Sequence, residues 1–219
     1  MPMINLSTGI PALLEPARGS QRRGGLVVAQ EIFGLNVNIR ALCSRFAEDG
    51  FDVIAPAYFD RIEAGFTAPY DQDGIQKGLS AVRATSWDQV TTDTQAAIDV
   101  LRETQSRIFV TGFCWGGTVA WVAACRCAGV TAASGFYGRM INMFLAETPN
   151  VPIELHYGDA DPGIPLNLVN EVRVAHPQVP IHLYPAGHGF FSDRGHDFDP
   201  TQADLAWART LDLFYQAKG

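Results

Sequence analysis

The sequence predicts an α/β fold with a mostly parallel central sheet and helices on both faces. Short apolar segments, typical of buried strands, alternate along the chain with longer segments whose apolar residues recur at helical spacing. This alternation favours parallel strands, because a crossover helix joins each strand to the next. No repeat, low-complexity segment or linker divides the 219 residues, so we expect residues 1–219 to form one domain.

The expected strands are short apolar segments bounded by turn residues. Gly24-Gly25 precedes the first of them, and Pro56 ends the second. The strands are expected at residues 26–29, 51–55, 107–111, 131–136, 151–157 and 180–184, and the segment 3–14 is expected to add an edge strand.

The expected helices begin at capping residues. Asn36 is expected to cap a helix that stops at Gly50. Ser86-Trp87-Asp88-Gln89 has the form of a capping box, and apolar residues at helical spacing follow it. Further helices are expected at residues 74–84, 115–128 and 165–175, and a last one from about Thr201, with Asp204 at its third position.

The composition excludes several classes of protein. Hydrophobic residues make up 47% of the chain and charged residues 18%, which is too apolar for a disordered chain. A formal charge of −7 without a basic stripe predicts no nucleic-acid partner. The longest apolar run, Val119 to Cys125, is far shorter than the ~20 residues of a membrane span. The N-terminus has no secretory pattern, so we expect a cytoplasmic protein without a membrane partner.

The four cysteines do not form a disulfide or zinc pattern. Cys125 and Cys127 are one residue apart, which is not a zinc-binding spacing, and no second pair accompanies them. The first strand–helix turn lacks a dinucleotide-binding glycine motif, and no phosphate loop occurs. We therefore expect no metal and no organic cofactor. The sequence does not set the oligomeric state.

The motif Gly112-Phe113-Cys114-Trp115-Gly116-Gly117 lies between an expected strand and an expected helix. Its G-x-nucleophile-x-G pattern is that of a nucleophile elbow, with cysteine in the place of serine. The chain must reverse sharply there, and side chains at Gly112 and Gly116 would collide with neighbouring backbone. The N-terminus of the following helix stabilises a thiolate and offers N–H groups to an oxyanion. Cys114 is the predicted nucleophile.

His188 is the predicted base among five histidines. It lies in the glycine-flanked segment Ala186-Gly187-His188-Gly189-Phe190, just after a strand and before the last helix. His196 is the second candidate. His156 and His182 fall inside expected strands and His176 falls at a helix end, where structural roles are common.

Two aspartates are candidates for the acid that orients the base. Asp159 and Asp161 follow a strand, and both satisfy the chain order nucleophile, acid, histidine. Spacing alone does not choose between them. Glu31 follows the first central strand and is expected to point toward the site, although a loop or capping role fits its position equally well.

These stretches together resemble the dienelactone hydrolase family, a cysteine branch of the α/β-hydrolases. The matching segments occur in order along most of the chain: residues 28–34, the elbow at 112–117, Phe136-Tyr137-Gly138, residues 158–165 and the histidine loop at 186–190. The resemblance implies an α/β-hydrolase fold without a large lid domain. It also implies an enzyme that hydrolyses a small-molecule ester or lactone.

The resemblance also implies individual roles. Asp161 becomes the preferred acid, because the family's G-x-x-D-x-x-x-P pattern falls on Gly158, Asp161 and Pro165. Glu31 corresponds to the glutamate that holds the resting thiol and is displaced by substrate. The backbone N–H groups of Ile32 and Trp115 become the oxyanion donors.

The substrate pocket is where this chain departs from the family. Apolar pocket residues are expected among Phe33, Phe59, Tyr137, Phe190 and Phe191. The family holds its substrate carboxylate with two arginines. The first position aligns with Gln76 and Lys77, with Arg61 and Arg83 further away; the second falls on Ser192, with Arg194 displaced but close enough to be a candidate for substrate binding.

Three functions therefore remain open at the level of sequence. The first is a cysteine hydrolase that opens lactones or cleaves small esters through a thioester. The second is a general carboxylesterase or thioesterase with the same triad. The third is a non-catalytic ligand-binding protein on the same fold, which the presence of every candidate triad member disfavours.

Overall fold

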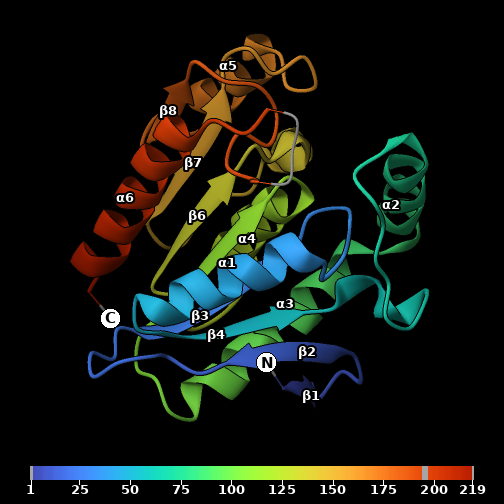
Figure 1. The fold of residues 1–219 in the computed structure, drawn as a ribbon. Helices are drawn as coiled ribbons and strands as arrows, with labels where there is room; N and C mark the ends of the chain where they lie inside the picture. Colours follow the sequence, from blue (N-terminus) through green and yellow to red (C-terminus); the bar gives the residue numbers. More distant parts are fainter. Residues whose placement is uncertain (1, 194–196, 219) are drawn as a thin grey trace.

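The centre of the computed structural model, which describes residues 2–193 and 197–218, is a twisted eight-stranded sheet (Figure 1). Within these residues the strand order is β1-β2-β4-β3-β5-β6-β7-β8. Every pair from β4 to β8 is parallel, and β2 pairs antiparallel with both β1 and β4. The strands are β1 (Met3–Asn5), β2 (Pro11–Glu15), β3 (Gly24–Ala29), β4 (Phe51–Pro56), β5 (Ile108–Phe113), β6 (Ala132–Phe136), β7 (Ile153–Gly158) and β8 (Ile181–Tyr184).

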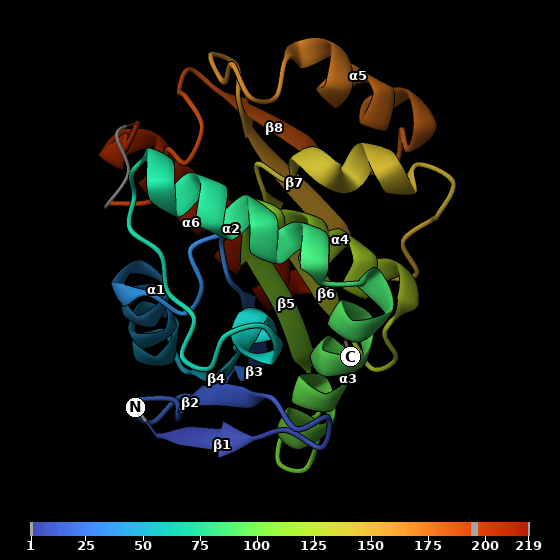
Figure 2. The ribbon, with the colours of Figure 1, turned by 90° about the vertical axis from the view of Figure 1, so that its right-hand side faces the viewer.

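Helices cover both faces of the sheet, as the sequence predicts (Figures 1 and 2). Helices α1 and α6 lie together on one face, and α3 and α4 lie on the other. Two short 3₁₀ helices, η1 and η2, follow β4 and β6. The α-helices are α1 (Val37–Glu48), α2 (Gln72–Ala84), α3 (Trp87–Arg102), α4 (Trp115–Arg126), α5 (Leu166–Ala175) and α6 (Pro200–Gln216); η1 is Tyr58–Arg61 and η2 is Arg139–Phe144.

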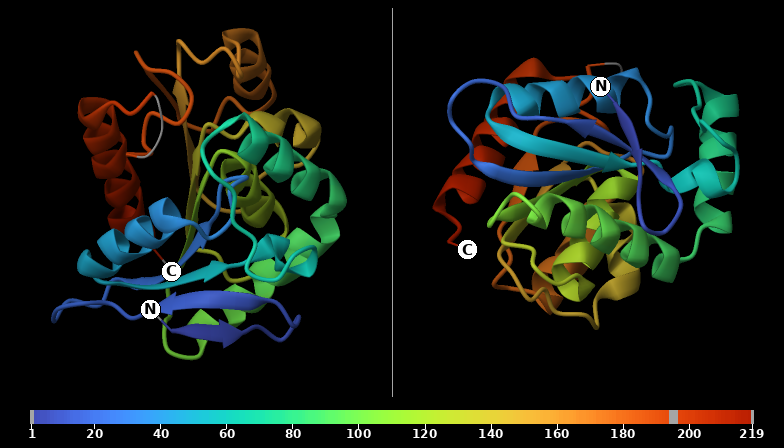
Figure 3. Two further views of the ribbon diagram at one scale, coloured as in Figure 1. Left: turned by 45° about the vertical axis from the view of Figure 1, so that its right-hand side comes forward. Right: turned by 90° about the horizontal axis from the view of Figure 1, so that it is seen from below.

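Helix α2 stands apart from these two layers. Figure 2 and the left view of Figure 3 show it in front of the carboxyl ends of the central strands, beside η2. It belongs to the connection between β4 and α3, so the cover at this edge is one helix with its flanking loops. Within the described residues, no inserted lid domain is present, as the family resemblance predicts.

The capping predictions for two helices are confirmed. Asn36 Oδ1 accepts a hydrogen bond from the N–H of Ile39 at 3.1 Å, and Ser86 and Gln89 form the expected reciprocal capping box. The last helix differs slightly, since it begins at Pro200. Asp199 is its cap and accepts from the N–H of Gln202 at 3.0 Å. Proline suits this first position because its missing N–H has no helical partner there.

The expected edge strand at residues 3–14 is two strands. The turn between β1 and β2 is closed by a hydrogen bond from the N–H of Leu6 to the carbonyl of Ile10, and Gly9 takes a φ of 88° inside it. A tight turn with a left-handed residue reverses the chain within the segment. Strand β2 then adds to β4, while the three-residue β1 forms the outer edge.

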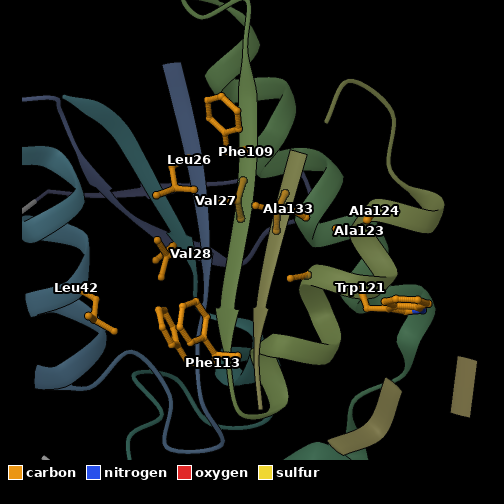
Figure 4. Close-up of a cluster of buried hydrophobic side chains, with 14 of the residues drawn as sticks. Leu26, Val27, Val28, Leu42, Phe109, Phe113, Trp121, Ala123, Ala124 and Ala133 are labelled. Carbon is orange, nitrogen blue, oxygen red and sulfur yellow. The ribbon is translucent and has the colours of Figure 1, made fainter. Parts of the chain in front are cut away.

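Two apolar layers fill the space between the sheet and its helices (Figure 4). Strands β3 and β5 are buried along their whole length, which explains their continuous apolar sequences. On one face, Phe46 of α1 stacks on Trp207 of α6 with ring centres 4.2 Å apart. On the other, Trp121 of α4 is fully buried. Full burial of an apolar aromatic side chain such as that of Phe46 contributes about 1.5–3 kcal/mol to folding.

A buried polar cluster joins β6, β7, β8 and α6. His156 is fully buried, and its Nδ1 lies 2.7 Å from the Tyr184 hydroxyl. Its Nε2 lies 3.0 Å from Glu154, whose other oxygen lies 3.1 Å from Nε2 of His182. Burial lowers the pKa of His156, so this imidazole is neutral near pH 7. Burial alone would raise the pKa of Glu154, but the two histidines lower it to about 2.

The Glu154 cluster predicts acid-sensitive stability. Because the pKa of Glu154 is lower in the folded state, its stabilising contribution is present above about pH 4.5 and is lost as the pH falls toward 2. We expect Glu154→Gln to lower the free energy of unfolding by about 1–3 kcal/mol at pH 7 and by less at pH 3. Urea unfolding followed by tryptophan fluorescence measures both values. The exposed Glu103→Gln is the control, and an equal loss at the two pH values would contradict the assignment.

Candidate active site

The predicted elbow forms the junction between β5 and α4. Cys114 lies between them with φ 56° and ψ −116°, a conformation that a non-glycine residue adopts only under strain. Its N–H donates to the carbonyl of Phe136 at 3.0 Å. A side chain on Gly112 would overlap the carbonyl oxygen of Gly116, and one on Gly116 would overlap the carbonyl oxygen of Ala29. The two glycines thus allow α4 to begin against the ends of β3 and β5.

The structure brings three of the predicted residues together. Nε2 of His188 lies 3.4 Å from Sγ of Cys114, and its Nδ1 lies 2.6 Å from Oδ2 of Asp161. Asp161 is 4% exposed, and its Oδ1 accepts N–H bonds from Gly163 and Ile164 at 2.7 and 3.1 Å. Asp159 is exposed, and its N–H donates to the carbonyl of Tyr184. The geometry therefore selects Asp161 over Asp159 as the partner of the histidine.

The surroundings of His188 favour its charged form. Burial would lower its pKa, but negative charge on the sulfur of Cys114 and the carboxylate of Asp161 raise it to about 11. The ring packs 5.0 Å from the ring of Tyr137. An imidazolium between a sulfur and a buried carboxylate is the arrangement expected of an activated cysteine.

Glu31 lies near His188 but forms its hydrogen bonds with residues outside the Cys114–His188–Asp161 set. It is 3% exposed, and its Oε2 accepts from the hydroxyl of Tyr70 and, at 3.3 Å, from Nδ2 of Asn38. Burial raises its pKa, against the lowering effects of these two donors and of the charge on His188. Within the described residues the hydrogen-bond partner of the thiol is His188. The expected contact between Glu31 and the resting thiol is therefore not present in this conformation.

Tyr70 and Asn38 are partners that the sequence analysis missed. Asn38 is the second residue of the helix that Asn36 caps, and Tyr70 lies in the loop before α2. This loop is joined to the segment after Glu31 by an isolated bridge between Gly34 and Thr67. No local sequence pattern marks these contacts: Tyr70 is 39 residues from Glu31 along the chain, and Asn38 is 7 residues from it, in the following helix.

A cavity of about 310 Å³ opens beside the thiol. Its wall includes Cys114, His188, Ile32 and Trp115, together with the expected residues Phe33 and Tyr137. The remaining wall residues are Ile75, Leu79, Val82, Arg139, Met140 and Gly163. The three from α2 follow helical spacing, a signal that could have identified them from the sequence. Arg139 and Met140 belong to η2 and have no such signal.

The other expected pocket residues lie elsewhere. Phe190 is fully buried, 4.8 Å from the ring of Tyr184 and 5.8 Å from that of Tyr137, and thus supports the wall from behind. Phe59 packs on Trp115, and Phe191 stacks on Phe113. Arg194 and His196 lie outside the described residues.

Among the described residues, none of the cations considered for the substrate carboxylate belongs to the cavity wall. Lys77 forms an ion pair with Glu63 at 3.0 Å, and Arg61 pairs with the buried Asp93 at 2.5 Å. Ser192 is 2% exposed. None of these three residues belongs to the cavity wall.

Residues 2–193 and 197–218 contain no group of three or more histidines, cysteines and carboxylates able to hold a metal ion. No helix of this part of the chain has both the length and the apolar character needed to cross a membrane.

The site geometry agrees with the family comparison. The family model described as "Dienelactone hydrolase family" matches residues 10–218. The chain belongs to the dienelactone hydrolase family. Members of this family are carboxylic ester hydrolases, and so is this chain.

Individual relatives and a solved structure support this membership. A protein of Escherichia coli K12 is 32% identical over 225 residues, covering 93% of this chain and 82% of its own length. The carboxymethylenebutenolidase of Pseudomonas putida is 29% identical over 198 residues, covering 86% and 84%. A crystal structure from Klebsiella pneumoniae, assigned to the dienelactone hydrolases, has a TM-score of 0.82 at 26% identity and covers 95% of this chain and 93% of that one.

The four cysteines of this dienelactone hydrolase family member are expected to differ sharply in reactivity. Burial raises the pKa of Cys125 and of Cys127 to about 12, and raises that of Cys43 further. Within the described residues, Cys114 is the cysteine with an imidazole as its hydrogen-bond partner. We expect iodoacetamide to label Cys114 first in the native protein at pH 7, and His188→Ala to slow that labelling at least about 10-fold. Peptide mass spectrometry measures each site, and equally fast labelling of Cys125 would contradict this expectation.

Proposed function

We propose that this protein hydrolyses small esters and lactones through a thioester on Cys114. The hydrogen-bonded chain from Sγ of Cys114 through His188 to Asp161, beside an apolar cavity, is the observation that carries the proposal. This set contains a nucleophile, a proton carrier and an orienting acid, and these are the groups that acyl transfer requires.

Acylation begins with attack by the sulfur of Cys114, as a thiolate, on the carbonyl carbon. A carbon–sulfur bond forms, and the carbonyl π electrons move to oxygen. We assign the oxyanion to the N–H groups of Ile32 and Trp115, both of which border the cavity. Trp115 is the first residue of α4, so its N–H has no carbonyl one helical turn before it. The intermediate then expels the alkoxide, which takes a proton from the His188 imidazolium.

Deacylation reverses these roles. Neutral His188 takes a proton from water as the water oxygen bonds to the thioester carbon. Collapse of the second tetrahedral intermediate breaks the carbon–sulfur bond and returns the thiolate, with the acid as product. In a lactone the expelled oxygen stays attached to the acyl group, so one ring-opened acid is released. Asp161 stabilises the imidazolium in both half-reactions through its 2.6 Å contact with Nδ1.

Glu31 has a supporting electrostatic role in this proposal. Its buried carboxylate interacts favourably with the positive charge on His188. Tyr70 and Asn38 hold it in place from the loop and from α1. Exchange of Glu31 from these partners to the thiol, as the family resemblance implies, would require the Tyr70 hydrogen bond to break.

The substrate class follows from the family and from the cavity. The carboxymethylenebutenolidase relative supports lactone opening. The wall contributed by Ile32, Phe33 and α2 is apolar and favours an acyl group without many polar atoms. The same observation favours simple carboxylic esters as a second candidate. Rates on cis- and trans-dienelactone, compared with rates on 4-nitrophenyl esters, distinguish the two.

Removal of the sulfur should abolish turnover. We expect Cys114→Ala to lower kcat on 4-nitrophenyl butyrate to background and His188→Ala to lower it at least about 100-fold, while circular dichroism shows that the fold is unchanged. The half-buried Cys125→Ala is the matched control and should retain wild-type activity. Wild-type turnover by Cys114→Ala, at active-site stoichiometry, would refute the proposal.

The two neighbouring aspartates provide a paired test of the orienting acid. Asp161→Asn removes the negative charge next to Nδ1 of His188, so we expect kcat to fall at least about 10-fold. The pKa of His188 that the pH–rate profile reports should also fall, because the carboxylate of Asp161 raises it in the wild-type protein. Asp159→Asn changes an exposed residue two positions away and should alter kcat less than about twofold. The reverse pattern would move the role to Asp159.

A further inference from the structure

The connection between β4 and α3 packs directly on the segment that follows β3. The N–H of Ala68 donates to the carbonyl of Phe33 at 3.1 Å. Helix α2, which lies in front of the carboxyl ends of the central strands (Figure 2), approaches so closely that a side chain on Gly78 would overlap the carbonyl oxygen of Ile32. The connection therefore fixes the backbone next to Glu31 at two points.

Tyr70 extends this contact to a side chain of the catalytic region. Its ring packs on the ring of Phe33, with ring centres 4.3 Å apart. Its hydroxyl donates to Oε2 of Glu31 and accepts at 3.1 Å from Nδ2 of Asn36, the residue that caps α1. A single hydroxyl thus links the loop before α2, the start of α1 and the buried carboxylate.

The Glu31 carboxylate depends on its donors because it is buried. It is 3% exposed, and among the described residues its hydrogen-bond donors are Tyr70 and Asn38. Burial raises the pKa of Glu31, and Tyr70 opposes this effect more strongly than Asn38 does. His188 and Tyr137 also interact with the carboxylate electrostatically. Burial raises the pKa of Tyr137, so its hydroxyl is neutral near pH 7 and His188 carries the neighbouring charge.

We propose that Tyr70 is a positioning residue that holds the buried Glu31 carboxylate in place near the His188 imidazolium. This inference rests on the proposed function and deepens it, since it makes the β4–α3 connection part of the catalytic machinery. A carboxylate held at this position stabilises the imidazolium that protonates the leaving group. Loss of the hydroxyl would leave the carboxylate buried with one donor fewer, which is unfavourable for a buried acceptor.

Tyr70→Phe tests this role, because it removes the hydroxyl and keeps the ring on Phe33. We expect kcat on 4-nitrophenyl butyrate to fall about 3- to 10-fold. KM should change less than about twofold, since Tyr70 does not belong to the wall of the catalytic cavity.

Tyr215→Phe is the matched control. Tyr215 is 39% exposed, close to the 37% of Tyr70, and it lies on α6 outside the cavity wall. Its replacement should leave kcat and KM unchanged, which separates the loss of the Tyr70 hydroxyl from a general effect of a tyrosine-to-phenylalanine change.

A double-variant cycle separates positioning through Glu31 from an independent structural role. Glu31→Gln should lower kcat at least as much as Tyr70→Phe, because it removes the charge itself. Addition of Tyr70→Phe to Glu31→Gln should lower kcat by less than about 1.5-fold more, since the hydroxyl then has no carboxylate to hold. Two effects that multiply would show that Tyr70 acts independently of Glu31 and would overturn the inference.

The titration of Glu31 gives a readout that a loss of packing alone would not move. A donor to the charged form lowers the pKa of a carboxyl group, so removal of the Tyr70 hydroxyl should raise the pKa of Glu31. We expect its carboxyl ¹³C NMR titration, assigned by its absence in Glu31→Gln, to move up by at least about half a pH unit in Tyr70→Phe. The acidic limb of the pH–kcat profile should move in the same direction, and Tyr215→Phe should move neither.

The NMR titration does not require turnover, so it separates the two proposals. An unchanged Glu31 titration in Tyr70→Phe would overturn the inference while leaving hydrolysis at Cys114 intact. A shifted titration with unchanged kcat would also overturn it, because Tyr70 would then hold Glu31 without consequence for the reaction. A shifted titration in a protein that hydrolyses no ester would instead refute the proposed function and support the positioning of Glu31 by Tyr70.

Discussion

The close approach of α4 to the ends of β3 and β5 is the constraint on which the site depends. Gly112 and Gly116 allow backbone atoms to meet where any side chain would overlap a carbonyl oxygen. This contact holds Cys114 at a positive φ between the strand and the helix. The sulfur therefore lies at the carboxyl edge of the sheet, beside the N-terminus of α4 and within 3.4 Å of His188. The burial of β5 and α4 in the core offsets the energetic cost of this local backbone strain.

Burial governs the electrostatics around that sulfur in two different ways. Asp161 loses water but gains two N–H donors and the imidazole, so its charge is fully compensated. Glu31 has Tyr70 and Asn38 as donors, and burial still raises its pKa. The two buried acids of the site therefore differ: hydrogen bonds compensate the burial of Asp161, whereas burial outweighs the two donors at Glu31.

Local sequence patterns predicted much of the fold and part of the site. The strand–helix order, the caps at Asn36 and Ser86, the elbow and the histidine loop depend on residues within a few positions of one another. The two-strand form of the N-terminal segment, the buried place of Phe190 and the partners Tyr70 and Asn38 were missed. Each of these depends on which backbone and side-chain groups the fold brings into contact, and the apolar spacing and capping patterns do not specify those contacts.

The sequence by itself determined that a cysteine thiol lies at a tight strand–helix turn. Only glycine at positions 112 and 116 permits that turn, because any side chain there would overlap backbone atoms. It also determined the order of nucleophile, acid and histidine along the chain. Only the tertiary structure decided between Asp159 and Asp161, since the choice depends on which carboxylate the β7–α5 connection turns inward. It also decided that Arg139 and the apolar face of α2 share one cavity, because separate connections bring η2 and α2 to the same edge of the sheet.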